Sequence, residues 1–404
     1  MASIKVPTIL LPNKEINLEK WAVVECDQFV EQPDYWDTLK KSVMDSPSTL
    51  NMIIPEIHIK KANAKDYEKI FSTMEKYVDQ NILISNNQNI ILVERTLEDI
   101  VRKGIMVLID LESYSTTDKE ATIRPSENTT TYKKNICYNM RSSSLLEMPH
   151  VIMLIEDEND IIDYYSKMDN KKIYDFELNM NGGHLTGYNV KNQEELINEL
   201  NELCNNSCEK NKPFMIVGDG NHTVLSSKEY WEELKRTLSE NELKNHPARF
   251  LLVEVENICS NGVKLYPIHR ILKNFNSEFF CELEQLEIFK KQILLKKNNY
   301  YYVDSINNDV DAFSIIEDIQ SLIDNHIDKS NSEVTYVYDD LEFLNIVQEN
   351  KNKIGIMMPT IMKNEIFDYI SKKDRLPKKT FSLGKGKEKR YYLETRIIKK
   401  NRNL

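Results

Sequence analysis

Hydrophobic side chains recur along the chain at two spacings, and these spacings predict an alternation of helices and strands. In Asp66–Val78, Tyr67, Ile70, Met74 and Tyr77 fall three or four positions apart, on one face of a helix. Short aliphatic runs bounded by polar residues predict strands. The strand candidates are Trp21–Cys26, Ile90–Glu94, Ile105–Asp110, Val151–Glu156, Pro213–Val217 and Phe250–Val255, and further helices are expected at Pro33–Val43, Glu194–Cys204 and Thr223–Leu238. Because the two kinds of element interleave, we predict a mixed α/β (α+β) fold.

Composition and charge exclude several classes of protein. The 404 residues allow two or three domains, at roughly 100–200 residues each. A net charge of −11 argues against bulk binding to nucleic acid, which needs clustered Lys and Arg. Apolar runs fall far short of the roughly 20 residues of a membrane helix, and the N-terminus lacks a secretory signal pattern. The six cysteines are scattered, so we expect a reduced, cytoplasmic protein without a metal site and without membrane contact.

The glycines single out one region of the chain. Five of the ten lie within Asp175–Trp231, namely Gly182, Gly183, Gly187, Gly218 and Gly220. At the centre of this region, Phe214–His222 has the pattern of a strand, a glycine turn and the start of a helix. The free amides and the dipole at a helix N-terminus form a natural anion site. The alternative is an ordinary turn with a capping Asn, because the standard phosphate-loop and G-x-G-x-x-G sequences are absent.

The side chains of this turn have types that suit a bound nucleotide. Asn221 and Thr223 could cap the helix or donate hydrogen bonds, and His222 could donate to a phosphate oxygen. Asp219 could hold a ribose, orient another side chain, or help to hold Mg²⁺ through water. His184 lies in a second glycine-rich stretch, which also fits a simple hairpin around Gly182–Gly183.

Three further polar segments could contribute to a site. Arg124 and Glu127 lie in a polar loop after a strand candidate, where Glu127 is either a solvated residue or a general base for a hydroxyl. His269 and Arg270 follow a proline, and Arg270 could bind a carboxylate or phosphate or form a structural ion pair. The basic segment Leu376–Arg396 is either a solvated β-hairpin or a cationic lid over an anionic ligand.

Six blocks in order along the chain resemble one protein family. The blocks are Trp21–Trp36, Thr122–Thr129, Asp175–Tyr188, Asp219–His222, Pro267–Arg270 and Pro377–Phe381. Together they resemble domain-of-unknown-function family ten-fifteen, whose central motif is Asp-Gly-His-His-Arg and which looks related to the ParB/sulfiredoxin-like fold. This chain departs from the common motif at Asn221, Thr223 and Ser126, so it resembles a variant branch. Arg270 or the C-terminal lysines could replace the missing Arg.

The resemblance implies a nucleotide-binding core. Residues 116–275 would form a ParB-like core, flanked by an N-terminal α/β region at 1–115 and a C-terminal α/β region with the basic closing segment at 276–404. The similar fold includes kinases that act on free serine. By this resemblance, Glu127, His222 and Asp219 would be catalytic, while Gly218, Gly220, Asn221, Thr223 and His184 would hold the nucleotide. Arg124, Arg270 and His269 would bind the substrate.

The leading hypothesis is therefore an ATP- and Mg²⁺-dependent kinase of a small hydroxyl metabolite, with free L-serine converted to O-phosphoserine. The partners would be the nucleotide and a small-molecule substrate, with no nucleic acid and no membrane. The alternative is a regulatory protein that binds a nucleotide without turnover. A ParB-type protein associated with DNA is a third possibility, which the net charge of −11 disfavours.

Overall fold

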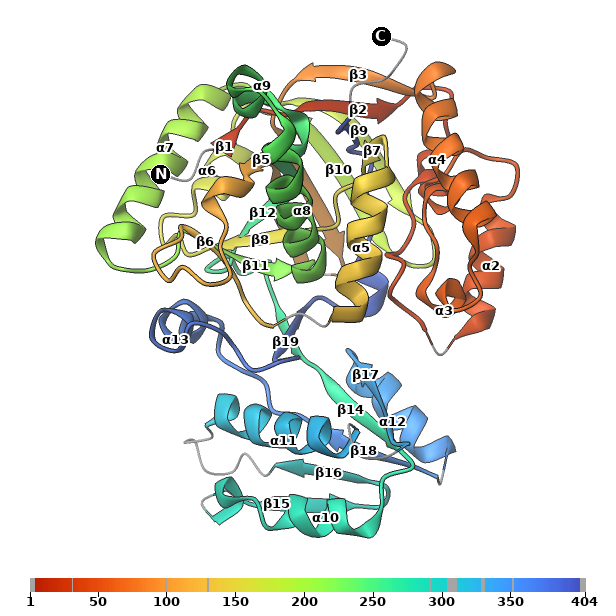
Figure 1. Ribbon diagram of the computed structural model, residues 1–404, viewed down its shortest axis with the longest axis vertical. Coiled ribbons are helices and arrows are strands. Elements are labelled where there is room, and N and C mark those ends of the chain that lie inside the picture. The colour runs from red at the N-terminus through yellow and green to blue at the C-terminus, as the bar shows by residue number, and fades with distance from the viewer. Residues whose placement is uncertain are drawn as a thin grey trace. The chain divides into compact units, whose positions relative to one another are not determined.

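The computed structural model describes residues 4–30, 32–98, 100–128, 131–290, 292–303, 311–327, 331–350 and 352–399. The chain divides into two compact units. The first unit contains the residues up to Val263 and those from Gly386 onward, and the second unit is Lys264–Lys385. The C-terminal segment of the chain is therefore part of the first unit. Figure 1 labels elements of both units, and its colours run from red at the N-terminus to blue at the C-terminus.

A mixed sheet forms the centre of the first unit. Within the described residues its strand order is β6-β11-β8-β12-β5-β4-β10-β9, and β1 pairs with β5. Two of its pairings, β6 with β11 and β8 with β12, are parallel, and the other pairings are antiparallel. The strands are β1 Ile4–Lys5, β4 Ile91–Leu97, β5 Ile100–Asp110, β6 Ile123–Pro125, β8 Ile152–Ile155, β9 Lys171–Leu178, β10 Gly183–Asn189, β11 Met215–Asp219 and β12 Phe250–Asn257.

Both faces of this sheet are covered, which explains its nearly continuous apolar strands. Along β5, Ile105, Val107 and Ile109 belong to one buried cluster, whereas Met106 and Leu108 belong to another. The helices of the first unit are α1 Leu18–Trp21, α2 Pro33–Val43, α3 Glu56–Ile59, α4 Ala64–Asp79, α5 Thr131–Ser143, α6 Ile161–Ser166, α7 Gln193–Glu209, α8 Asn221–Leu234 and α9 Glu240–Asn245. In Figure 1, α5 and α8 lie side by side in front of the sheet, in agreement with their many contacts.

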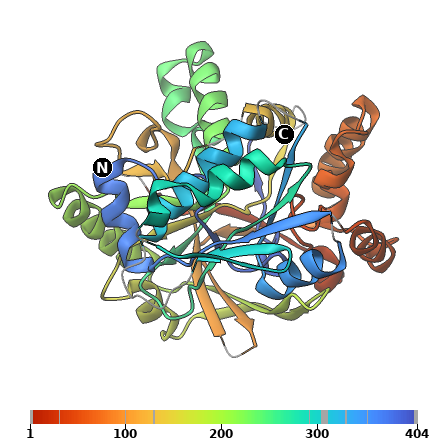
Figure 2. The same cartoon turned by 90° about the horizontal axis from the view of Figure 1, so that it is seen from below.

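The second unit has a sheet of its own, with the order β15-β16-β18-β14-β17. Its strands are β13 Leu265–Pro267, β14 His269–Lys273, β15 Leu294–Lys297, β16 Tyr300–Val303, β17 Glu333–Val337, β18 Lys353–Met357 and β19 Phe381–Leu383. Its helices are α10 Ser277–Glu284, α11 Ala312–Ile327, α12 Asp340–Glu349 and α13 Ile366–Lys373. Helix α12 packs against β18 and β14, and α10 packs against α11 (Figure 2).

The predicted mixed α/β fold is confirmed, and most of the predicted elements lie close to the positions that the hydrophobic spacing gave them. Strands from residues 1–115 and from later segments share one sheet, because β1, β4 and β5 join β12, β8 and β11. No helix in the described ranges is both long and apolar enough to cross a lipid bilayer.

Two sequence expectations are wrong. The predicted strand Trp21–Cys26 begins with the last residue of α1, which Asn17 caps, and only Val24 forms a bridge, to Arg390. The C-terminal segment is not a solvated hairpin. After Gly386 it crosses the first unit, and β20 (Arg396–Ile397) pairs with β7 (Leu146–Glu147). Arg390 and Arg396 are buried, and their guanidinium groups donate to carbonyls and carboxylates inside the unit.

Two smaller pairings complete the first unit. Strand β2 (Thr8–Pro12) pairs with β3 (Leu83–Gln88), and Leu10 also forms a bridge to Thr395. The N-terminal and C-terminal parts of the chain are thus joined by backbone hydrogen bonds. This explains how residues after Gly386 come to belong to the same unit as the start of the chain.

Candidate functional site

The glycine turn after β11 has the strand–turn–helix geometry that the sequence predicts. Strand β11 ends at Asp219, and α8 begins at Asn221 with Gly220 as its N-terminal cap. Gly220 has φ of 87°, and a Cβ atom at this position would lie 2.8 Å from Cγ2 of Val151. Both the backbone conformation and the lack of space therefore require glycine. Among the described residues no side chain caps α8, and its first turn carries no carboxylate.

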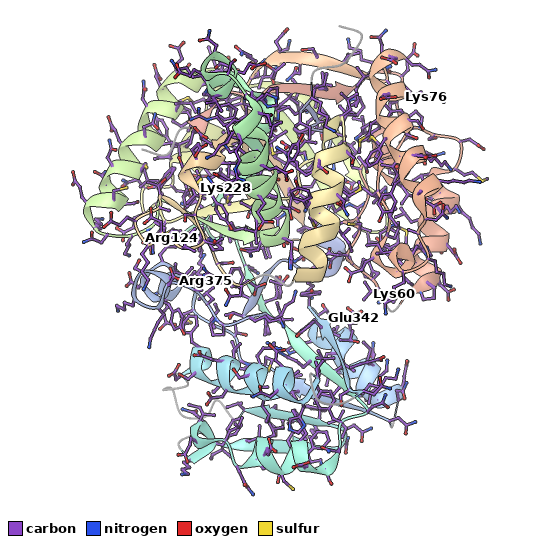
Figure 3. All side chains as sticks on the ribbon, in the orientation of Figure 1. Lys60, Lys76, Arg124, Lys228, Glu342 and Arg375 are labelled. Carbon is purple, nitrogen blue, oxygen red and sulfur yellow. The ribbon has the colours of Figure 1, made fainter. Side chains whose placement is uncertain are left out.

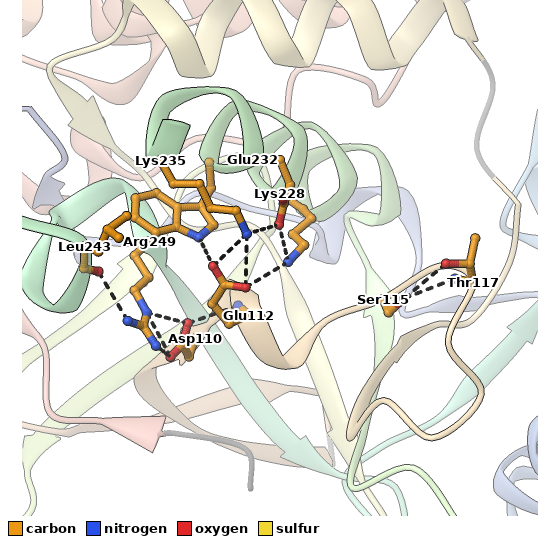
Figure 4. Close-up of polar contacts among 10 residues, drawn as sticks. Asp110, Glu112, Ser115, Thr117, Lys228, Glu232, Lys235, Leu243 and Arg249 are labelled. Atoms are coloured by element: carbon orange, nitrogen blue, oxygen red, sulfur yellow. Dashed lines mark hydrogen bonds and ion pairs between the residues drawn. The ribbon is translucent and has the colours of Figure 1, made fainter. Parts of the chain in front are cut away.

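The far half of α8 is held in place by a cluster of charged side chains around Glu112 (Figure 4). The indole of Trp231 donates to Oε1 of Glu112 over 2.6 Å, and Nζ of Lys235 lies 3.0 Å from the same atom. Lys228 and Lys235 also pair with Glu232 over 2.8 and 2.7 Å. These contacts join the C-terminal half of α8 to the short 3-10 turn Leu111–Ser113 directly after β5.

The loop with Glu127 lies beside the glycine turn. Strands β6 and β11 are parallel, with Pro125 opposite Val217, so both loops leave the same edge of the sheet. The carboxyl ends of parallel strands are the usual place for ligand sites in open α/β sheets. Asn221 links the loops, since its Oδ1 accepts from the Ser126 amide over 3.3 Å and its Nδ2 donates to Ser126 Oγ over 3.1 Å.

A cation from the C-terminal segment meets the carboxylate of the turn. Nζ of Lys389 lies 2.8 Å from Oδ2 of Asp219, and the Lys389 side chain is only 9% exposed. Oδ1 of Asp219 accepts from the Gly220 amide over 2.9 Å. The sequence singled out the basic segment but not Lys389 itself. The sequence signal for Lys389 is its location in the basic segment. The spacing of residues does not reveal that Asp219 is its partner.

Two further residues at this turn were missed as site residues. Glu25 is buried, and burial together with the carboxylates of Asp219 and Asp27 raises its pKa well above the usual range. Nε2 of His150 lies 2.9 Å from Oγ1 of Thr223, in the first turn of α8. Burial lowers the pKa of His150, although the nearby Asp219 carboxylate opposes this shift. Buried groups with shifted pKa values in one place are typical of functional sites.

His184 is not brought to this turn. It lies at the start of β10, and strands β8, β12, β5 and β4 separate β10 from β11 in the sheet. Its ring nitrogens contact carboxylates of β9, at 2.5 Å to Asp175 and 2.8 Å to Glu177, and these carboxylates raise its pKa. Gly183 opens β10 after a loop at residues 179–182, so the hairpin alternative accounts for this glycine-rich stretch.

His269 and Arg270 belong to the second unit and have structural partners there. The Arg270 side chain is fully buried, and its guanidinium donates to Gln320 over 3.0 Å and to the carbonyl of Lys379 over 3.0 Å. Nε2 of His269 lies 2.8 Å from Asp340, and its Nδ1 accepts from the Met358 amide. These contacts favour a role for both residues in the folding of the second unit.

Arg124 lies on β6, directly before the Glu127 loop, and is labelled in Figure 3. It is 6% exposed, and its Nε donates to the carbonyl of Ala121 over 3.3 Å. Arg124 pairs with Ile216 in the parallel strands β6 and β11, so it lies near the two loops that follow these strands. A role in substrate binding stays a prediction.

The chain matches one family of proteins. The model of the family described as "Protein of unknown function (DUF1015)" matches residues 10–383. The chain belongs to this family. The match confirms the resemblance inferred from the six sequence blocks, and it spans both compact units of this DUF1015 protein. No curated protein is similar enough to the chain to count as a match.

Solved structures with similar folds are remote from this DUF1015 protein. A free serine kinase variant in complex with ADP has 8% identity and a TM-score of 0.41, and the match covers 74% of this chain and 95% of that one. A conserved hypothetical protein from Pyrococcus furiosus has 8% identity, a TM-score of 0.38, and coverage of 73% and 95%. SbnI from Staphylococcus aureus, with a C-terminal truncation, has 8% identity, a TM-score of 0.37, and coverage of 69% and 82%. Likeness at this level supports no argument about the site.

Proposed function

We propose that this DUF1015 protein is an ATP- and Mg²⁺-dependent kinase of a small hydroxyl metabolite, with free L-serine as the first acceptor to test. One observation carries the proposal. The paired hydrogen bonds between Asn221 and Ser126 hold the loop of a candidate general base, Glu127, against a candidate phosphate turn, Gly218–His222. Phosphoryl transfer needs these two parts close together, because its catalysis is mostly positioning and charge stabilisation.

The phosphates of the nucleotide would bind at the start of α8. The first amides of a helix have no partners inside the helix, and the dipole adds positive potential there. Gly220 permits this turn because it has no Cβ atom, since its φ is positive and Val151 fills the space beside it. His222 and Lys389 would add donors and positive charge, and Lys389 already contacts Asp219 in the same turn.

The residues at the turn suit Mg²⁺ held mainly by the nucleotide. The described residues contain no cluster of three or more side chains that could bind a metal ion by themselves. Mg²⁺ usually binds proteins through one or two carboxylates, together with phosphate oxygens and waters. Asp219 would supply one carboxylate, and Glu25 is the buried neighbour that could supply a second. The ion would neutralise charge on the transferred phosphoryl group.

Glu127 would accept the proton of the acceptor hydroxyl as its oxygen attacks the γ-phosphorus of ATP. The new O–P bond forms while the bond from phosphorus to the β–γ bridging oxygen breaks, so ADP leaves with that bond's electron pair. Glu127 is partly exposed, which allows it to reach a substrate and to return its proton to water. Serine is the first acceptor to test because the sequence blocks resemble a fold that includes free-serine kinases.

Phosphorus NMR on the purified full chain tests this function directly. The protein is incubated with ATP, Mg²⁺ and L-serine, and in parallel with a mixture of small hydroxyl compounds. We expect a new phosphomonoester signal that grows as ATP is converted to ADP. Intact ATP with shifted or broadened signals would favour the nucleotide-binding regulator instead. ATP signals that stay unchanged would contradict nucleotide binding at the turn.

Two substitutions make the assignment of the base specific. Glu127→Gln should abolish the phosphomonoester signal while ADP still binds, because only the proton acceptor is lost. Glu120→Gln, at an exposed position before β6, should behave like the unchanged protein. If Glu127→Gln keeps full turnover, the assignment of Glu127 as the base is wrong.

A further inference from the structure

A cavity of about 190 Å³ lies inside the first unit, next to the start of α8. It is bounded by side chains of α4 and α5 and by the segment that leads into β8, elements that Figure 1 shows near one another. Most of its wall is apolar and includes Met52, Ile54, Met74, Met140, Met148 and Leu252. Nothing in the sequence pattern indicates this cavity, because its wall comes from segments that are distant along the chain.

The cavity lies beside the proposed phosphate turn. Thr223, in the first turn of α8, is part of the cavity wall, and its backbone amide donates to the carbonyl of Gly220. His150 and Val151 line the same end, and Val151 is the residue against which Gly220 packs. A ligand with its phosphates at Gly220 can therefore place its remaining part in the cavity, one helical turn away.

The chemistry of the wall favours an uncharged aromatic ring. Four of the wall residues are methionines, whose polarisable sulfur atoms make favourable contacts with aromatic rings. The charged pair in the wall, Arg141 and Glu147, is buried and already paired, so it offers no free charge to a ligand. A zwitterion such as serine would lose its hydration without gaining partners here. An engineered apolar cavity of about 150 Å³ is large enough for a benzene-sized ring.

We propose that this cavity holds the purine base of the bound nucleotide, while the phosphates bind at the start of α8. The inference rests on the proposed function, since it assumes a nucleotide at the turn. Cys26, Tyr391, His150 and Thr223 are polar residues of the cavity wall, and the His150 ring lies 5.5 Å from the Tyr391 ring. The hydroxyl of Tyr391 donates to the Cys26 sulfur over 3.3 Å. The acceptor then binds outside the cavity, on the side of the Glu127 loop.

Methyl NMR on the protein labelled at the methionine ε-carbons tests this placement. Single Met→Leu variants assign the signals. ADP should shift the methyl signals of Met52, Met74, Met140 and Met148 upfield through the ring current of the base. Met44 and Met362 are 65% and 64% exposed and serve as internal controls, so their signals should stay in place. Pyrophosphate, which has no ring, should leave the four cavity signals nearly unchanged.

A cavity-filling variant gives an independent readout. Cys137→Phe places a ring in the cavity from α5 and should weaken ADP binding by about tenfold or more, while pyrophosphate affinity stays the same. Asn139→Phe, on the exposed side of the same helix, should leave both affinities unchanged. Circular dichroism confirms that each variant is folded, and the methyl shifts decide the question if Cys137→Phe does not fold.

The outcomes separate this inference from the proposed function. If ADP and pyrophosphate bind equally well and ADP leaves the four methyl signals in place, the base lies elsewhere, while the phosphate site stands. If L-serine or an aromatic alcohol alone shifts these signals, the cavity binds the acceptor and the inference is wrong. If neither ADP nor pyrophosphate binds, the proposed function and the base site are both wrong.

Discussion

Nζ of Lys389 lies 2.8 Å from Oδ2 of Asp219, so a basic residue near the end of the chain meets the carboxylate of the glycine turn. Asp27 adds negative charge nearby, and burial together with the carboxylates of Asp219 and Asp27 raises the pKa of Glu25. Lys389 offsets part of this charge. Without it, three carboxyl groups would surround a position at which a phosphate is expected to bind.

Replacement of Lys389 by Met should weaken nucleotide binding. The variant leaves Asp219 without its cation and adds repulsion toward the phosphates, so we expect a loss of ADP affinity of about tenfold, or roughly 1.4 kcal/mol. Lys387→Met is the matched control, because Lys387 is more exposed and only approaches Glu98, at 3.7 Å. Calorimetric titration with ADP checks both. Equal affinities in the two variants would refute a role of Lys389 at the site.

Replacement of Asn221 by Ala should lower turnover more than it lowers nucleotide affinity. The variant removes both hydrogen bonds to Ser126 and leaves a buried amide unpaired, at a cost of about 1–3 kcal/mol. Ser126→Ala removes only the bond from the Asn221 side chain, so its effect should be smaller. Steady-state rates with ATP and the acceptor, measured beside ADP affinity, test whether Asn221→Ala has the larger defect in turnover. A larger defect in Ser126→Ala would contradict the linking role of Asn221.

Replacement of Gly220 by Ala should destabilise the first unit and impair the turn. A residue with a side chain at φ of 87° costs about 1–2 kcal/mol, and contact with Val151 adds to this. Gly386→Ala is the control, since its nearest contact for a new Cβ atom is 3.3 Å, to the Gln28 side chain. Urea unfolding measures the two free energies. Val151→Ala, combined with Gly220→Ala, should restore only the part of the lost stability that comes from the contact with the Val151 side chain.

The stability of the first unit should fall as pH rises from about 5 to 8. Burial raises the pKa of Glu394 to about 7, from an ordinary value of 4.5. The folded state therefore keeps a proton that the unfolded chain loses first, and the free energy of unfolding decreases across this window by an amount on the order of 3 kcal/mol. Glu394 Oε1 accepts from Tyr174 over 2.6 Å, which fixes the side chain in the interior.

Glu394→Gln should reduce this pH dependence, because the amide does not titrate. The remaining slope would come from Glu25, Glu254 and Glu256, whose pKa values burial also raises, to about 8 for Glu256. Urea unfolding at several pH values between 5 and 8 checks the change in slope, and Glu68→Gln on the exposed side of α4 serves as the control. An unchanged slope in Glu394→Gln would mean that this carboxyl is ionised in the folded protein.

The hydrophobic spacing located four helices and five strands of the first unit, because spacing reflects which side of an element is buried. Met74 and Tyr77 lie on the buried face of α4, as their positions in the sequence indicate. Strands β4, β5, β8, β11 and β12 of the central sheet were recognisable as apolar runs, because helices or other segments cover both faces. The spacing failed at Trp21–Cys26, where one apolar run is shared between the end of a short helix and an extended segment.

The sequence also located the centre of the candidate site. Gly218–His222 was recognisable, since glycines are rare in this chain and the turn is a local structure. Glu127 could be identified as a neighbour of this glycine turn only through the family resemblance. The parallel register of β6 and β11 and the bonds from Asn221 explain this proximity in physical terms. Neither feature leaves a local pattern in the sequence.

By itself the sequence determined the mixed α/β class, the family, the glycine turn, and four helices and five strands of the first unit, because these depend on local spacing or on ordered motifs. The tertiary structure decided which distant residues meet. It pairs Lys389 with Asp219, buries Arg270 in the second unit, separates His184 from the turn and encloses the apolar cavity. A buried charge needs a partner, and the partner can come from any segment that the fold brings within a few ångströms.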